Sequence, residues 1–382
     1  MQIFQTKSDE VSKVKRKFMA EPGLHLYSGG ASVLRPSDVY RFGKEPAFRE
    51  LLQGCNIYLI ARRPRISLDP TSLKIVDGMY VHGWFRVHGE EPGSFERFAF
   101  YQDRPKVRLA DGMPMRFVRV EAMSSAGLEI KLMDEYGNTG LTPVNALIAD
   151  SRHSLGSHCN LEVLYVGQAF GDNGSRLAID RTAVHSTLQR ILAETLDEKP
   201  HHEILLMLFR YEHAKNMFCT AGDPDVEVSA SWEQEYEMLS KGNKLTLPRK
   251  ARIALAEAAL ISYFKPRYNV MLQDAFNIQK TKKLKFLREV LKMDFSALTV
   301  EINTSTFGSK LYSDFARAKE LKDIFPEDAI ARLTSPTWPD EANLSRQEVK
   351  QFVAEMTHAH IARSPLYSKT ERETFLHSLR WE

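Results

Sequence analysis

The chain has 382 residues, of which 43% are hydrophobic, 26% are charged and 10% are aromatic, and its formal net charge is only +3. This composition is globular and excludes a mainly disordered chain, and the length predicts two or three domains. The small net charge excludes a protein that coats nucleic acid through charge alone.

The apolar stretches are too short or too interrupted to span a bilayer, and the N-terminus lacks an apolar segment followed by a cleavage site. We therefore expect no membrane partner, no signal peptide and a cytoplasmic location. The cysteines Cys55, Cys159 and Cys219 are odd in number and lack CxxC spacing. Neither a disulfide framework nor a four-thiolate zinc site is expected.

The first part of the chain, residues 1–142, is predicted to be a β-rich domain. Segments rich in β-branched and aromatic residues alternate there with Gly, Pro and Asp. These segments are 56–60, 79–87, 95–101, 115–123 and 128–133. Gly137 and Asn138 tolerate positive φ, which predicts a hairpin turn at 136–140. Some small antiparallel sheets and barrels bind nucleic acid, so binding by this domain is a hypothesis by analogy.

After residue 142 the predicted elements include helices as well as strands, and the fold class expected for the whole chain is α+β. In the middle part, 143–275, strands are expected to alternate with helices. The strands are expected at 144–149, 161–166 and 203–209, and the helices at 177–193 and 249–264. The last part, 276–382, is predicted to be mainly helical. Helical spacing occurs at 282–291, 311–325, 345–363 and 369–379, with one lone strand at 297–302.

Glu257 lies on the apolar stripe of the alanine-rich helix expected at 249–264. A carboxylate in that position loses several kcal/mol of solvation, by order of magnitude, unless it binds a cation or is paired. The pattern therefore predicts a metal, or an ion pair with an arginine at the edge of the core, and the sequence leaves both open.

A second group of polar residues surrounds a predicted strand that ends at Tyr165-Val166-Gly167. On the helix that follows, Arg181 and His185 are four residues apart, so we expect both on one face, one turn apart. Such a pair can present a fixed cation and a titratable imidazole to one phosphate. The alternative for each residue is an ordinary surface or packing role.

These segments together resemble the GIY-YIG nuclease superfamily, which includes the nuclease module of bacterial UvrC and the restriction and homing endonucleases. Glu257 is followed by Pro266-Arg267-Tyr268-Asn269, as at the end of that module, and Tyr165-Val166-Gly167 is similar to the second signature tripeptide. Arg181 and His185 resemble the helix pair of the restriction and homing members. The resemblance covers about residues 145–275 and implies a small sheet with helices.

One feature of the family is missing from the expected place. The first tripeptide, which normally ends in a Tyr about ten residues before the second, has no counterpart in the predicted strand at 146–150. Either Asp150 or a residue from another segment takes that place, or the site is impaired. Tyr136 is the nearest upstream tyrosine, but its hairpin context makes it a poor substitute.

The resemblance implies an endonuclease that hydrolyses phosphodiester bonds and depends on Mg²⁺ or Mn²⁺. Glu257 would bind the metal, Arg181 would stabilise the transition state, and Asn269 would orient the site. Tyr165 or His185 would act on the water, and the sequence does not decide between them. The alternative is a catalytically impaired protein of the same fold that only binds nucleic acid.

DNA is the expected partner, in restriction, defence or repair, with RNA as the alternative, and a homo-oligomer is left open. Two basic runs are expected to contact the nucleic acid, although either can be a solvated helix face. They contribute Arg249, Lys250 and Arg252, and Lys280, Lys282 and Lys283. A zinc site is not expected at 153–159 or 201–202, because the ligand spacing is not met.

Overall fold

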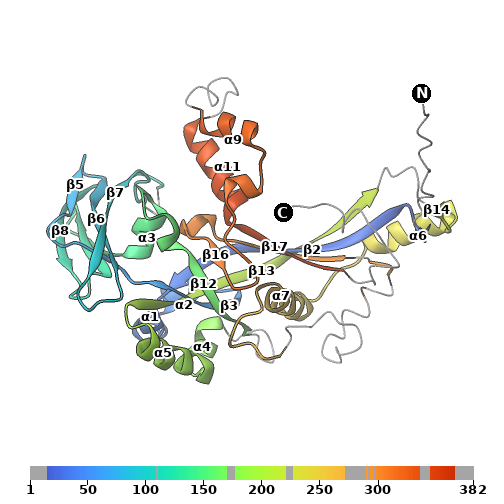
Figure 1. The fold of residues 1–382 in the computed structure, drawn as a ribbon, viewed down its shortest axis with the longest axis horizontal. Helices are drawn as coiled ribbons and strands as arrows, with labels where there is room; N and C mark the ends of the chain where they lie inside the picture. The colour runs from blue at the N-terminus through green and yellow to red at the C-terminus, as the bar shows by residue number, and fades with distance from the viewer. Residues whose placement is uncertain are drawn as a thin grey trace, which may run out of the picture.

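The computed structural model describes residues 15–108, 111–169, 177–220, 227–271, 290, 293–295, 297–335 and 345–365. Its fold is mixed α/β (Figure 1). Within these described ranges, no helix is long and apolar enough to cross a membrane.

A seven-stranded sheet forms the centre of the molecule, with strand order β16-β12-β3-β13-β2-β15-β17. Its longest strands are β2 (Ala20–Leu34) and β13 (His202–Thr220). The others are β3 (Cys55–Pro64), β12 (Leu161–Gln168), β15 (Ala297–Asn303), β16 (Leu311–Tyr312) and β17 (Ala359–Pro365). Neighbouring strands are antiparallel except β12 with β16 and β2 with β15.

This sheet takes strands from all three parts of the chain that the sequence predicted as separate domains. The strand β3 precedes residue 142, β12 and β13 lie within 143–275, and β15 to β17 follow residue 276. The predicted boundaries thus fall between strands of a single sheet. The expected lone strand at 297–302 is β15, and it pairs with β2 on one side and β17 on the other.

Residues 66–159, called the inserted module from here on, lie between β3 and β12 and hold most of the predicted β-rich segments. Four strands, with β5 (Lys74–Val76) attached to β6, form one sheet in the order β11 (Ser151–His153), β7 (Phe95–Gln102), β6 (Tyr80–His88), β4 (Ile66–Leu68). A second sheet holds β8 (Phe117–Met123), β9 (Glu129–Asp134) and β10 (Thr139–Pro143). The predicted turn is confirmed, since β9 and β10 pair as a hairpin and Gly137 has φ 82°.

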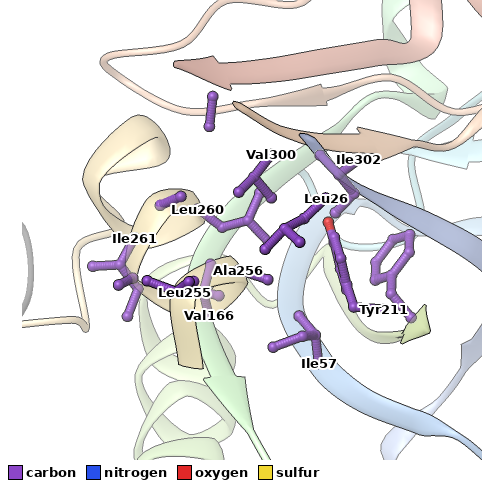
Figure 2. Packing of buried hydrophobic residues seen from close by; sticks show 14 of the residues in the cluster. Leu26, Ile57, Val166, Tyr211, Leu255, Ala256, Leu260, Ile261, Val300 and Ile302 are labelled. Atoms are coloured by element: carbon purple, nitrogen blue, oxygen red, sulfur yellow. The ribbon is translucent and has the colours of Figure 1, made fainter. Parts of the chain in front are cut away.

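Helices cover both faces of the central sheet near β3, β12 and β13. On one face lies α7 (Arg249–Phe264), whose bounds match the predicted helix, and Figure 2 shows its Leu255, Ala256 and Leu260 among apolar side chains of the strands. The opposite face packs against α1 (Pro36–Phe42), α2 (Pro46–Leu51), α4 (Ala178–Thr182) and α5 (Ser186–Glu198).

The remaining elements lie towards the ends of the chain. Two short strands, β1 (Lys15–Arg16) and β14 (Glu227–Val228), pair in parallel, and α6 (Trp232–Asn243) follows them. Further along come α9 (Glu327–Thr334) and α11 (Arg346–His358), with 3-10 turns at Gly156–Cys159, Ser305–Phe307 and Leu321–Asp323. The expected helices at 282–291 and 369–379 lie largely or entirely outside the described residues.

Two predicted elements are wrong, and a third is wrong in part, because the helix expected at 345–363 ends at His358 and the strand β17 begins at Ala359. Residues 144–149 form a helix, α3 (Val144–Ala149), and not a strand, because Val144, Leu147 and Ile148 recur at helical spacing and all three are buried. Residues 311–325 do not form a helix. There Ser313 Oγ accepts hydrogen bonds from the backbone N–H groups of Phe315 and Ala316, which favours a turn over a helix.

Candidate active site

Two tyrosines lie side by side on the antiparallel strands β3 and β12. Tyr58 on β3 is opposite Gly167 on β12, and its ring centroid is 6.1 Å from that of Tyr165. A Cβ added at Gly167 would lie 2.6 Å from the Tyr58 hydroxyl oxygen and 2.7 Å from a ring carbon of Tyr165. Only glycine leaves room at this position for both rings.

The register of β12 turns Tyr165 towards the face that carries α4 and α5. The pairing with β3 shifts between Val163 and Tyr165, so that Leu164 and Tyr165 both pack against that face, while Val163 and Val166 face α7. Such a bulge re-aims side chains locally. Tyr165 is therefore half-buried beside the fully buried Tyr58.

His185 lies beside the two tyrosines, on the face of the sheet that carries α4 and α5. Its ring centroid is 5.0 Å from that of Tyr165 and 5.8 Å from that of Tyr58. It is the N-cap of α5, where Nδ1 accepts a 3.1 Å hydrogen bond from the N–H of Leu188. Burial and the charge of Arg181 lower the pKa of His185, so the ring is neutral near pH 7 with its proton on Nε2.

The expected helix at 177–193, with Arg181 and His185 one turn apart on one face, is wrong in detail. Arg181 lies near the end of α4, whereas His185 has extended backbone angles and begins α5. The capping bond of His185 breaks the helix in two. Both residues still lie in one group, because Arg181 is close enough to lower the pKa of His185 and hydrogen bonds to Tyr58.

Glu257 belongs to α7 and approaches the tyrosines from the other side of the sheet. It is half-buried, and its charge contributes to the raised pKa of both Tyr58 and Tyr165. The strand β12 lies near the edge of the sheet, because β16 pairs only with Leu161 and Glu162. Among the described residues, the remainder of β12 pairs with no strand other than β3.

Asn269 covers that edge. Its side-chain amide donates to the carbonyl of Val166 at 2.9 Å and accepts from the N–H of Val166 at 2.8 Å. The N–H of the preceding residue, Tyr268, donates to the carbonyl of Leu164 at 3.1 Å. A primary amide here replaces a missing neighbouring strand and fixes the backbone between Tyr165 and Gly167. The geometry makes Asn269 a positioning residue.

The electrostatics keep the two phenols protonated. Burial raises the pKa of Tyr58, with further increases from Tyr165 and Glu257, and Arg181 opposes them. Burial and then Glu257 raise the pKa of Tyr165, while a hydrogen bond from Tyr58 lowers it. A cation beside Glu257 would offset the carboxylate charge that disfavours ionisation of both rings.

The residues expected to contact nucleic acid differ from one another in their exposure and contacts. Arg249 donates a 2.8 Å hydrogen bond to Asn56 Oδ1 and so helps to fix the start of β3, while Lys250 is exposed and Arg252 is half-buried. The three predicted lysines of the second basic run, Lys280, Lys282 and Lys283, lie outside the described residues.

The histidines near Cys159 form hydrogen bonds and packing contacts. His153 Nε2 lies 3.2 Å from the carbonyl of Ile148, and the Cys159 thiol donates to the carbonyl of Gly156. Within the ranges that the structure describes, no group of three or more His, Cys, Asp and Glu side chains could hold a metal ion.

Sequence reasoning missed Tyr58. The tripeptide Asn56-Ile57-Tyr58 lies in a strand that the sequence did predict, but about 100 residues before Tyr165 and not about ten. A search that allowed a whole module between the two strands would have found it. Comparison of the chain with family models, with curated proteins and with solved structures gave no match.

Proposed function

We propose that the chain is a divalent-metal-dependent endonuclease of the GIY-YIG type that hydrolyses phosphodiester bonds in DNA. The observation that carries the proposal is the convergence of five polar side chains from five separate elements around the end of β12. They are Tyr58, Tyr165, Arg181, His185 and Glu257. Tyr58, Tyr165 and His185 have shifted pKa values, and a group of titratable residues with such shifts is typical of a catalytic site.

In this proposal Tyr58 takes the place of the family's first signature tyrosine. The tripeptide Asn56-Ile57-Tyr58 lies on the strand antiparallel to Tyr165-Val166-Gly167, and both tyrosines contact His185. The inserted module separates the two strands along the chain, which accounts for the missing tripeptide just before β12. Asn56 stands where the family has its glycine, and its Nδ2 donates to the carbonyl of Ala169 at 2.6 Å.

Glu257 would hold the metal. One half-buried carboxylate with solvent access suits Mg²⁺ or Mn²⁺, which keep several waters and bind phosphate oxygens directly. The raised pKa values of the two tyrosines fit a site that is completed by a cation, because Glu257 contributes to both shifts. When bound, the ion would supply Lewis acidity at the phosphate and lower the pKa of nearby groups.

The other side chains of the site would have separate roles. Arg181 is exposed at the rim, where its guanidinium can contact a phosphate oxygen and stabilise charge in the transition state. Tyr165 would take a proton from water only after losing its own proton to solvent, and a cation at Glu257 would favour that loss by offsetting the carboxylate charge that, after burial, raises the pKa of Tyr165. His185 has Nδ1 occupied by its capping bond, so its Nε2–H orients a neighbouring oxygen and does not act as the base.

The proposal is tested by incubating supercoiled plasmid and single-stranded DNA with the purified full chain, in Mg²⁺, in Mn²⁺ and in chelator. Metal-dependent cleavage is expected from the wild type, and Tyr58→Phe is expected to lower it because it removes the hydroxyl group that hydrogen bonds with Tyr165. The matched control is Tyr40→Phe, which removes an exposed hydroxyl that donates to the carbonyl of Ala183. Nucleic-acid binding without cleavage in any metal would favour the impaired, binding-only protein.

A further inference from the structure

The inserted module has a two-stranded surface, formed by β6 and β7, that presents aromatic and basic side chains to solvent. Alternate residues of both strands point into the core of the module, among them Val81, Phe85, Val87 and Phe100. The residues between them share the opposite face as cross-strand pairs. These pairs are His82 with Tyr101, Trp84 with Ala99, Arg86 with Arg97, and His88 with Phe95.

Three large aromatic rings on this face are exposed to solvent. The exposed fractions are 43% for Trp84, 40% for Phe95 and 50% for Tyr101. An aromatic ring left open on a strand pair loses the burial that usually stabilises it, at roughly 25 cal/mol per Å². Arg86 and Arg97 lie over the Phe95 ring, 4.6 and 5.7 Å from its centroid, which leaves Trp84 and Tyr101 to stack on planar ligands.

The arginines on the same face are held in place. Arg86 and Arg97 are directly opposite each other, an arrangement that is destabilising unless the charges are compensated. Asp69, which is 1% exposed, lies beneath them and forms an ion pair of 2.9 Å with each. The two guanidinium groups share the single carboxylate of Asp69, so the three side chains together keep a net positive charge. The same ion pairs hold both guanidinium groups in a fixed orientation.

Further cations extend the face at both sides. Lys74 on β5 is opposite His82, and Arg152 on β11 is opposite Tyr101. Arg152 is largely exposed and lies 3.4 Å from Asp103. Aromatic rings are thus interleaved with positive charge across four strands, a combination typical of surfaces that bind nucleic-acid strands.

We propose that this face, called the aromatic platform and defined by Trp84, Arg86, Phe95, Arg97 and Tyr101, binds a single-stranded segment of DNA. Unpaired bases stack on the rings while the guanidinium groups contact phosphates. A duplex is disfavoured because its bases are already stacked on each other and expose only their edges. The inference takes DNA as the ligand from the proposed function, but binding by the platform does not depend on the chemistry at Glu257.

The test measures fluorescence anisotropy of a labelled 12-nucleotide oligo-dT with the full chain, in chelator so that cleavage is excluded. Trp84→Ala/Tyr101→Ala should weaken binding by at least about tenfold, as expected when two bases lose stacking partners. The matched control is Trp232→Ala/Tyr236→Ala, which removes an exposed, stacked aromatic pair from α6. The control should bind like the wild type.

Three further measurements test whether the platform binds single-stranded DNA by stacking. Trp84→Phe retains a stacking face and should restore most of the affinity lost in Trp84→Ala, which a folding defect alone would not produce. Duplex of equal length should bind more weakly than oligo-dT, and oligo-rU separates RNA from DNA. Unchanged affinity in the platform variant, an equal loss in the α6 control, or a clear preference for duplex or RNA would overturn the proposal. Failure of the wild type to cleave would contradict the nuclease proposal and leave this test intact.

Discussion

The candidate active site and the aromatic platform use the same kinds of side chain in opposite environments. At the candidate site, Tyr58 is fully buried and Tyr165 is half-buried, and burial raises the pKa of both. On the platform, Tyr101 is half-exposed beside a two-arginine pair that is fixed by Asp69. Burial keeps the phenols of the first group protonated, whereas the aromatic rings of the second group remain exposed to solvent.

The two regions also differ in how their geometry is enforced. The candidate site depends on non-local contacts, such as the amide of Asn269 on β12 and the close approach of Tyr58 to Gly167. The platform depends on the pairing of two adjacent strands, with core side chains on the other face. Substitutions should therefore affect chemistry at the first region and affinity at the second.

A large effect on cleavage is expected for Arg181→Ala. Loss of a donor to charge that grows in the transition state should lower the cleavage rate by ~10² to 10³, while oligo-dT affinity stays within about twofold. Arg97→Ala is the contrasting variant, and it should weaken binding without changing the rate at saturating DNA. Single-turnover cleavage and anisotropy measure the two quantities. An equal loss of rate in both variants would remove the distinction between the regions.

A smaller effect is expected for Gly167→Ala. The added Cβ would lie 2.6 Å from the Tyr58 hydroxyl, so the tyrosines must shift, and overpacking of this kind costs about 1–3 kcal/mol of stability. Gly140→Ala in the inserted module is the matched control, because a Cβ there meets nothing within 4 Å. Thermal melting should separate the variants. Equal melting temperatures would show that the two tyrosines are not confined as described.

The buried histidine of β17 should make the central sheet sensitive to acid. His360 is fully buried and hydrogen bonds to Tyr263, and burial lowers its pKa to about 3. Because the folded state disfavours protonation, this contribution to stability is complete above pH 6.5 and is lost as the pH falls, by about 2 kcal/mol at pH 5.

Denaturant unfolding at pH 7.5 and pH 5 checks this effect. The wild type should lose about 2 kcal/mol more between the two pH values than His360→Gln does. His158→Gln in the inserted module, which replaces a partly exposed histidine, should lose as much as the wild type. Equal losses in all three proteins would contradict the assignment.

Local patterns in the sequence predicted a good part of the fold. The helix α7 follows from its apolar spacing and the strand β7 from its aromatic residues, and both have nearly the predicted bounds. The composition of β15 predicted a strand. It did not predict that this strand pairs with β2 and β17, because pairing partners far apart in the chain leave no local signal.

The candidate site was predicted only in part for the same reason. Glu257 and Asn269 are close in sequence, so one motif revealed both. Tyr58 joins them only after β3 pairs with β12 across the inserted module, which no local pattern encodes. The capping bond of His185, which divides α4 from α5, likewise overrode the helical spacing that the sequence showed.

The most direct test of the central claim is Mg²⁺-dependent cleavage by Glu257→Gln, measured with thermal melting on the same preparation. The substitution keeps the shape and hydrogen-bonding capacity of the side chain but removes the charge that would hold the metal. We expect no cleavage at any Mg²⁺ concentration, retained oligo-dT binding, and a change in stability below about 1 kcal/mol. If Glu257 is instead one half of a structural ion pair, stability should fall by roughly 3 to 5 kcal/mol. Wild-type Mg²⁺-dependent activity per folded molecule in that variant would contradict the account.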